Sequence, residues 1–149
     1  MASIWSDADR DDLVRRMWTL TPTHSANWGR LTVHGMLAHL NDAVRMATGD
    51  LVVGSNRRAP AFLQWPLVRY LVIHKLPMPK GAPTADELLA RCDGAVLAGE
   101  QQRFATLFDG LPRRTTLAAV HPAFGPLTRH DWGALLHKHT DHHLRQFGV

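Results

Sequence analysis

The C-terminal stretch places the strongest constraint on the fold, because histidine is concentrated there at helical spacing. Four of the chain's ten histidines lie within residues 137–143. Upstream, Thr128 followed three residues later by Asp131 is typical of a helix start, and Gly148 stands where a helix ends. A helix over residues 129–146 places one set of side chains on a single face, apolar at first and then imidazole and amide: Trp132, Leu135, Leu136, His139, His143 and Gln146.

His139 and His143 are one turn apart on that face, so both imidazoles can reach one metal ion. Residues four apart in a helix are separated by about 6 Å along its axis, and imidazole binds zinc at about 2.0–2.1 Å. The pair is not the metalloprotease motif, because Thr140 stands where the glutamate base would be. With histidine this abundant, the same spacing also suits ordinary core or surface histidines, and a third ligand is needed to decide between the two interpretations.

Length and composition indicate a single domain over residues 1–149, and no internal repeat interrupts it. The single cysteine, Cys92, cannot form an intramolecular disulfide, which favours the reducing cytoplasm. No apolar run approaches the length of a membrane span. The aspartate-rich N-terminus resembles neither a secretory signal nor a transit peptide. We therefore expect a cytoplasmic protein with no membrane partner.

A net charge of +4 and a pI near 10.0 raise the question of nucleic-acid binding. No helix-turn-helix, zinc-finger or RNA-binding signature is present. The basic residues come in scattered pairs without interleaved aromatic residues, rather than in a stripe: Arg15-Arg16, Arg57-Arg58 and Arg113-Arg114. We therefore expect the charge to serve solubility or to attract anions, with nucleic-acid binding as a minor alternative.

Apolar periodicity and capping signals predict an all-α fold with almost no strand signal. The predicted helices, one of them short, cover residues 6–20, 32–47, 60–74, 84–91, 96–109 and 129–146. Pro66 lies in the first turn of the third helix or kinks it, so that helix begins near residue 60 or near residue 65. Proline and glycine mark the connections between them: 21–31, 50–59, 77–83 and 111–127. The apolar stripe of the first helix is expected to contain Leu13, Val14, Met17, Trp18 and Leu20, and Val96 is expected to be an apolar position of the fifth.

Histidines outside the last helix differ in what their positions indicate. His39 lies in the middle of the apolar stripe of helix 32–47, where a histidine is either hydrogen-bonded in the core or a ligand. His34 lies about 140° away around the same helix and is expected at the surface. His74 is expected to be exposed at a helix C-terminus. Trp28 and His121 lie in loops, where Trp28 either anchors its loop in the core or lines a pocket.

Three segments together resemble the DinB-like superfamily, and more closely one of its bacterial branches. They are Trp28–Leu40 (WGRLTVHGMLAHL), His121–Leu127 (HPAFGPL) and His139–Gln146 (HTDHHLRQ), and the resemblance covers nearly the whole chain in order. It implies a DinB-like four-helix bundle, here with an extra short helix and long crossover loops.

The resemblance also implies a divalent metal held by three histidines. Matched residue by residue, the ligands are His39 on the second helix and the pair His139 and His143 on the last. His142 matches the family's frequent extra histidine but lies off the core face, so we expect it behind the ligands or at the surface. His130 and His137 are expected in solvent. Zinc or nickel suits imidazole donors best, with iron left open.

What the resemblance implies about activity is a metal-dependent enzyme that acts on a small molecule. DinB-like members include transferases and isomerases that use low-molecular-weight thiols, so thiol-dependent transfer and hydrolysis both stay open here. No spacing argument assigns a general base, although Asn41, Asp42 and His121 are candidates by position. The alternative is a non-catalytic, metal-stabilised bundle with a binding or stress-related role. DinB-like bundles often pair, which makes a homodimer an open expectation.

Overall fold

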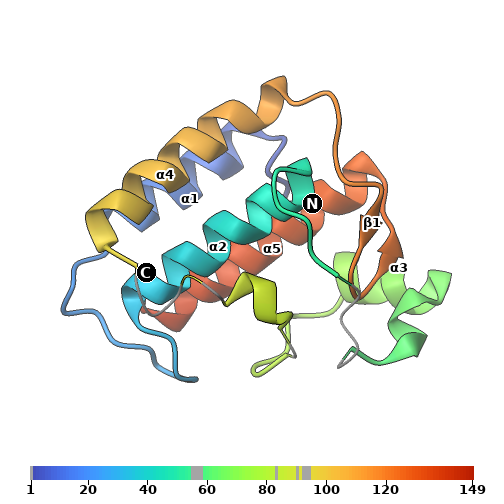
Figure 1. Cartoon of the computed structure of the whole chain (residues 1–149), viewed down its shortest axis with the longest axis horizontal. Coiled ribbons are helices and arrows are strands. Elements are labelled where there is room, and N and C mark those ends of the chain that lie inside the picture. The colour runs from blue at the N-terminus through green and yellow to red at the C-terminus, as the bar shows by residue number, and fades with distance from the viewer. Residues whose placement is uncertain (1, 55–58, 83, 90, 92–94) are drawn as a thin grey trace.

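The computed structural model describes residues 2–54, 59–82, 84–89, 91 and 95–149, and these are mostly helical (Figure 1). The α-helices are α1 (Asp7–Trp18), α2 (Val33–Thr48), α3 (Pro66–His74), α4 (Leu97–Gly110) and α5 (Arg129–Gln146). Short 3-10 turns are η1 (Ala61–Gln64), η2 (Asp86–Leu88) and η3 (Leu111–Arg113). Strands β1 (Val120–His121) and β2 (Gly125–Pro126) pair antiparallel. The predicted all-α class is confirmed.

The two longest helices begin and end at the predicted signals. Thr32 accepts a hydrogen bond from the backbone of Gly35 at 3.0 Å, and Gly49 follows α2 with a positive φ of 81°. Thr128 and Asp131 form a reciprocal capping box at the start of α5. These local contacts fix the register of α5, and therefore which of its histidines face inward.

The helix predicted to begin near residue 60 or near residue 65 begins at Pro66, because Trp65 is extended and the turn η1 precedes it. Other predictions about the elements need correction. In place of a helix over 84–91 the described residues hold only the turn η2. The connection 111–127 contains η3 and the small hairpin. Cys92, Arg57 and Arg58 lie outside the described residues.

The four longest α-helices pack in a closed set of contacts, with α2 and α1 each touching both α4 and α5 (Figure 1). α3 packs against α5. Buried side chains from all four long helices form the core, among them Leu13, Met17, Met36, Leu37, Phe104, Phe108, Trp132 and Leu144. Trp18 and Val96, expected in apolar stripes, are 49% and 70% exposed because they stand at helix ends. No helix among the described residues is long and apolar enough to cross a membrane.

His74 is buried rather than exposed, which corrects the expectation for α3. Its Nε2 atom lies 2.7 Å from Oδ1 of Asp131, the same carboxylate that caps α5. This contact ties the end of α3 to the start of α5, so the capping acid also holds the two helices together.

Gly133 allows the N-terminal segment to cross α5 closely. A Cβ atom at this position would collide with the indole of Trp5. Ile4 donates a backbone hydrogen bond to the Gly133 carbonyl at 3.2 Å, and the Trp5 indole N–H donates to the Arg129 carbonyl at 2.8 Å. The Arg129 guanidinium also lies 3.9 Å from the centre of the Trp5 ring. Close packing at this crossing therefore requires glycine, which has no side chain, at position 133.

We predict that Gly133→Ala lowers the free energy of unfolding by about 1–3 kcal/mol, because the added methyl group overpacks the crossing. Equilibrium urea unfolding measures the change. Gly99→Ala is the matched control: Gly99 is an exposed glycine of α4 with nothing near the added Cβ. That substitution is expected to leave stability unchanged or to raise it by up to about 1 kcal/mol. Equal effects of the two substitutions would contradict the proposed overpacking.

Candidate metal centre

Helices α2 and α5 bring His39, His139 and His143 together. The three ring centres are 4.9 Å (39 to 139), 5.0 Å (39 to 143) and 4.8 Å (139 to 143) apart, a nearly equilateral triangle. One potential ligand nitrogen from each lies within 4.8 Å of the others. The three residues that the resemblance groups as ligands therefore lie together in the structure, although His39 and His139 are 100 residues apart in the sequence.

His39 is held in a defined tautomer. Its Nδ1 atom lies 3.2 Å from the carbonyl oxygen of Leu88 in η2. A carbonyl can only accept a hydrogen bond, so Nδ1 carries the proton and Nε2 presents a lone pair. The side chain is buried, with 4% of its surface exposed. A turn distant in sequence thus orients the ring of the first candidate ligand.

His143 is oriented through Gln146. The amide nitrogen of Gln146 donates to the carbonyl of Trp28 at 2.5 Å, which turns its Oε1 atom toward His143 Nδ1 at 2.7 Å. Nδ1 of His143 therefore donates, and its Nε2 is left with the lone pair. Contacts of this kind fix the tautomer of metal-binding histidines.

The loop before α2 approaches Gln146 so closely that a side chain at position 29 would push the Gln146 amide out of place. Gly29 has a φ of +78°, and a Cβ atom there would lie 2.8 Å from the Gln146 amide nitrogen. Trp28 is half-buried, with its ring 5.5 Å from that of His142. Trp28 is therefore not a fully buried core anchor, and it does not line the cavity beside the three histidines. Its contribution to the site is the backbone carbonyl that accepts a hydrogen bond from Gln146.

The distance between the Nε2 atoms of His39 and His139 is 3.0 Å. This spacing suits a hydrogen bond donated by His139 to the His39 lone pair. It also suits two nitrogen ligands of one ion, since bonds of about 2.0–2.1 Å place neighbouring ligands roughly 2.9–3.4 Å apart for angles between about 90° and 110°. The three histidines could therefore hold a divalent metal ion, and the distance between His39 and His139 already lies in the range expected of two ligands.

Burial keeps the three imidazoles neutral. Desolvation is the main cause that lowers the pKa of His39, lowers that of His139 well below 6.5, and lowers that of His143 to about 3. The neighbouring imidazoles add to the effect at His139 and His143. Neutral imidazole is the form that binds metals, so the rings need no deprotonation at neutral pH.

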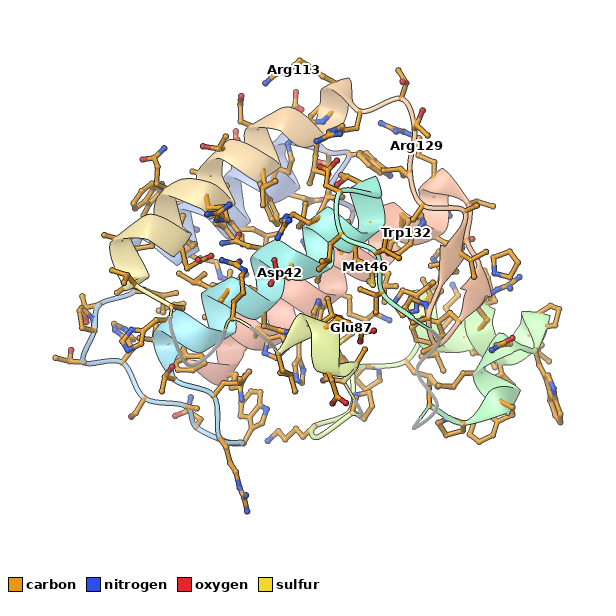
Figure 2. All side chains as sticks on the ribbon, in the orientation of Figure 1. Asp42, Met46, Glu87, Arg113, Arg129 and Trp132 are labelled. Atoms are coloured by element: carbon orange, nitrogen blue, oxygen red, sulfur yellow. The ribbon has the colours of Figure 1, made fainter. Side chains whose placement is uncertain are left out.

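A cavity of about 480 Å³ lies beside the triangle, with His39 and His139 in its wall. Most of its lining is apolar, and Met46 of α2 and Trp132 of α5, both labelled in Figure 2, face it from the two ligand-bearing helices. His121 of the hairpin, Thr84 and Lys138 are its other polar lining residues. The hairpin was expected only as a loop, so sequence alone left His121 unplaced.

Asn41 and Asp42, the acid–base candidates beside His39, have their hydrogen bonds elsewhere. Asn41 donates to the carboxylate of Glu100 at 2.7 Å. Asp42, 2% exposed and labelled in Figure 2, accepts hydrogen bonds from Arg91 Nε at 2.9 Å and Arg45 at 2.9 Å. Arg91 also donates to the Glu100 carboxylate at 2.8 Å, and the carboxylates of Asp42 and Glu100 together raise the pKa of Arg91. These contacts join Arg91, which follows η2, to α2 and α4, so Asp42 is engaged in structural ion pairs rather than placed as a base.

The remaining histidines of α5 lie outside the triangle. His142 is half-buried, and its ring packs edge-on against His143 with centres 5.3 Å apart. His130 is exposed and stacks on His74, and with Asp131 these two form a second group of potential ligands. The Asp131 carboxylate already serves His74 and the cap of α5, which accounts for this group without a metal.

A family model described as a protein of unknown function (DUF1569) matches residues 5–148. The chain belongs to this family. No curated protein and no solved structure matches it significantly. For this DUF1569 protein, chemistry must therefore be inferred from the geometry of the site.

We predict that the chelator-treated protein loses stability as the pH falls below 6.5. In the unfolded chain histidine protonates near pH 6.5, whereas folded His143 and His121 have pKa values of about 3 and about 4. The unfolded state therefore binds more protons between these limits, and each such histidine costs about 2 kcal/mol between pH 7.5 and pH 5.0. Urea unfolding at a series of pH values measures the loss.

Urea unfolding of His143→Gln over the same pH values isolates the contribution of His143 to the loss of stability. The loss between pH 7.5 and pH 5.0 is expected to shrink by about 2 kcal/mol, because a glutamine takes up no proton. The exposed residue His130, changed to glutamine, serves as the control substitution on the same helix. A stability independent of pH over this range would show the burial argument to be wrong.

Proposed function

We propose that this protein is a metal-dependent enzyme of the DinB-like type that acts on a small molecule. The observation that carries the proposal is the meeting of three imidazoles, His39, His139 and His143, beside an apolar cavity, with two of the rings oriented by hydrogen bonds. Burying a polar imidazole costs free energy, and here three are desolvated in mutual contact. A purely structural role for one core histidine does not explain this arrangement, whereas a shared metal ion does.

The DinB-like assignment draws support from the helix packing. In our proposal α1, α2, α4 and α5 are the four helices of the bundle, and α3 with the hairpin occupies its long connections. Metal sites in such bundles are built from side chains on facing helices. The contacts of α2 with α5, which carry all three candidate ligands, agree with this arrangement.

Three protein ligands leave coordination positions open, which is the mark of a catalytic rather than a structural site. A divalent cation held there, zinc or nickel in our proposal, would supply Lewis acidity to a substrate oxygen or sulfur. His39 and His143 would hold it through Nε2, because their Nδ1 protons are engaged by Leu88 and Gln146. His139 would complete the set from the next turn of α5.

The cavity favours catalysis over a purely structural role for the metal. A non-catalytic metal-stabilised bundle would close over its ion, whereas here His39 and His139 border a space of about 480 Å³. Its apolar walls would exclude bulk water and hold the substrate body by burial. Transfer to or from a low-molecular-weight thiol and hydrolysis are both compatible with this arrangement, and a homodimer remains part of the proposal.

We predict that the purified protein contains, or takes up, one divalent metal ion per chain. His143→Ala is expected to lose at least about tenfold in metal affinity, because two ligands remain of three. Elemental analysis after dialysis measures the stoichiometry, and competition with a coloured chelator measures the affinity. A wild-type protein that holds no metal and acquires none on incubation would end the proposal.

We predict that Gln146→Leu weakens metal binding by about 10- to 100-fold with little change in fold, because His143 loses the acceptor that fixes its tautomer. Gln102→Leu, at an exposed position of α4, is the matched control and is expected to bind metal like the wild type. The same chelator competition reports both. Equal affinities for the two variants would argue against an orienting role for Gln146.

A further inference from the structure

The β1–β2 hairpin brings His121 into the cavity wall, beside the first turns of α5. β1 and β2 pair through His121 and Gly125, whose φ of +72° allows the tight return. The ring of His121 lies 5.4 Å from that of Trp132 in α5 and 4.9 Å from that of Phe124. Both aromatic neighbours also line the cavity, so the histidine is embedded in its apolar surface.

The hairpin backbone fixes the tautomer of His121. The N–H groups of Ala123 and Phe124 both point at its Nδ1 atom, at 3.0 and 3.3 Å. Because both are donors, Nδ1 must accept, and the single proton of the neutral ring sits on Nε2. Burial lowers the pKa of His121 to about 4, which keeps the ring neutral at physiological pH.

Within the part of the chain that the structure describes, the Nε2–H group of His121 has no hydrogen-bond partner, and it is not one of the fully buried polar atoms that lack one. The other polar lining groups outside the triangle are engaged: Lys138 donates to the carbonyls of Val72 and Leu76 at 2.8 and 2.7 Å, and Thr84 donates to Ala82 at 3.4 Å. Among the described residues that line this largely apolar chamber outside the triangle, His121 is thus the donor that has no hydrogen-bond partner.

We propose that the Nε2–H of His121 donates a hydrogen bond to the substrate, and that the substrate is a compact apolar molecule with a carbonyl-type acceptor. An apolar chamber with one donor selects such a molecule over a purely hydrocarbon one, since a polar group is buried at low cost only when it is paired. The inference rests on the proposed function for the identity of the chamber as a substrate site.

The test uses two ligands of nearly the same shape, acetophenone and ethylbenzene, of which only the ketone accepts a hydrogen bond. Binding of each to the full-length protein is measured by calorimetry or by ligand-observed NMR. The variant is His121→Asn, because an asparagine oxygen can still accept the backbone N–H two residues on and so preserve the turn. Its amide cannot reach as far into the cavity as Nε2.

The wild type is expected to bind both ligands. His121→Asn is expected to bind acetophenone about 3- to 10-fold more weakly, the effect of one lost hydrogen bond, and to bind ethylbenzene within about twofold of the wild type. His130→Asn, at an exposed position, is the control and is expected to change neither affinity. Thermal melting of each variant verifies that it is folded.

Other outcomes would overturn the inference. These are a wild type that binds neither ligand, a variant that loses both ligands equally, and a ketone affinity that is unaffected by the substitution. Long-range proton–nitrogen NMR spectra give an independent readout: His121 should show its proton on Nε2, and a proton on Nδ1 would contradict the assignment.

Elemental analysis of the same samples separates the two proposals. If the protein binds no metal but its affinity for the ketone still depends on His121, the proposed metal-dependent enzyme is wrong and the donor role of His121 is supported. Protein with one metal ion per chain and no dependence on His121 would remove only the donor role.

Discussion

The packing of α2 against α5 is the contact on which the site depends. It places two imidazole nitrogens 3.0 Å apart inside the protein, with a third ring almost equally distant from both. Desolvation disfavours the charged form of each ring, and repulsion from neighbouring imidazoles adds to that effect at His139 and His143. An arrangement of this kind is stable only while the rings stay neutral, and the same neutrality makes them competent ligands.

Two peripheral segments hold the rings in place. The loop before α2 reaches His143 through Gln146, and η2 reaches His39 directly. Arg91 in turn fastens the segment after η2 to Asp42 and Glu100 in α2 and α4. The candidate ligands lie on α2 and α5. Segments outside these helices orient His39 directly and His143 indirectly, through Gln146 at the end of α5, and such supporting contacts are common at metal sites.

Much of this arrangement could be predicted from the sequence, because it rests on helical periodicity and end signals. The inward face of α5 and the histidine within the stripe of α2 followed from spacing, and the resemblance joined them into one set. Other features could not be predicted in this way. The Leu88 carbonyl belongs to a turn with no periodic signal, and the burial of His74 depends on a partner 57 residues away. His121 lines the cavity only because of a two-residue strand pairing, which is too short to leave a pattern.

The acceptors that hold the Gln146 amide and the His39 ring, at positions 28 and 88, are both main-chain carbonyls. A carbonyl survives almost any replacement of the side chain it belongs to, so evolution can vary both positions without altering these contacts. The restriction passes instead to Gly29, where a β-carbon would displace the Gln146 amide and where the positive φ favours glycine. Among relatives of this protein, an invariant glycine at position 29, with free variation at positions 28 and 88, would therefore be the evolutionary trace of the orienting contacts.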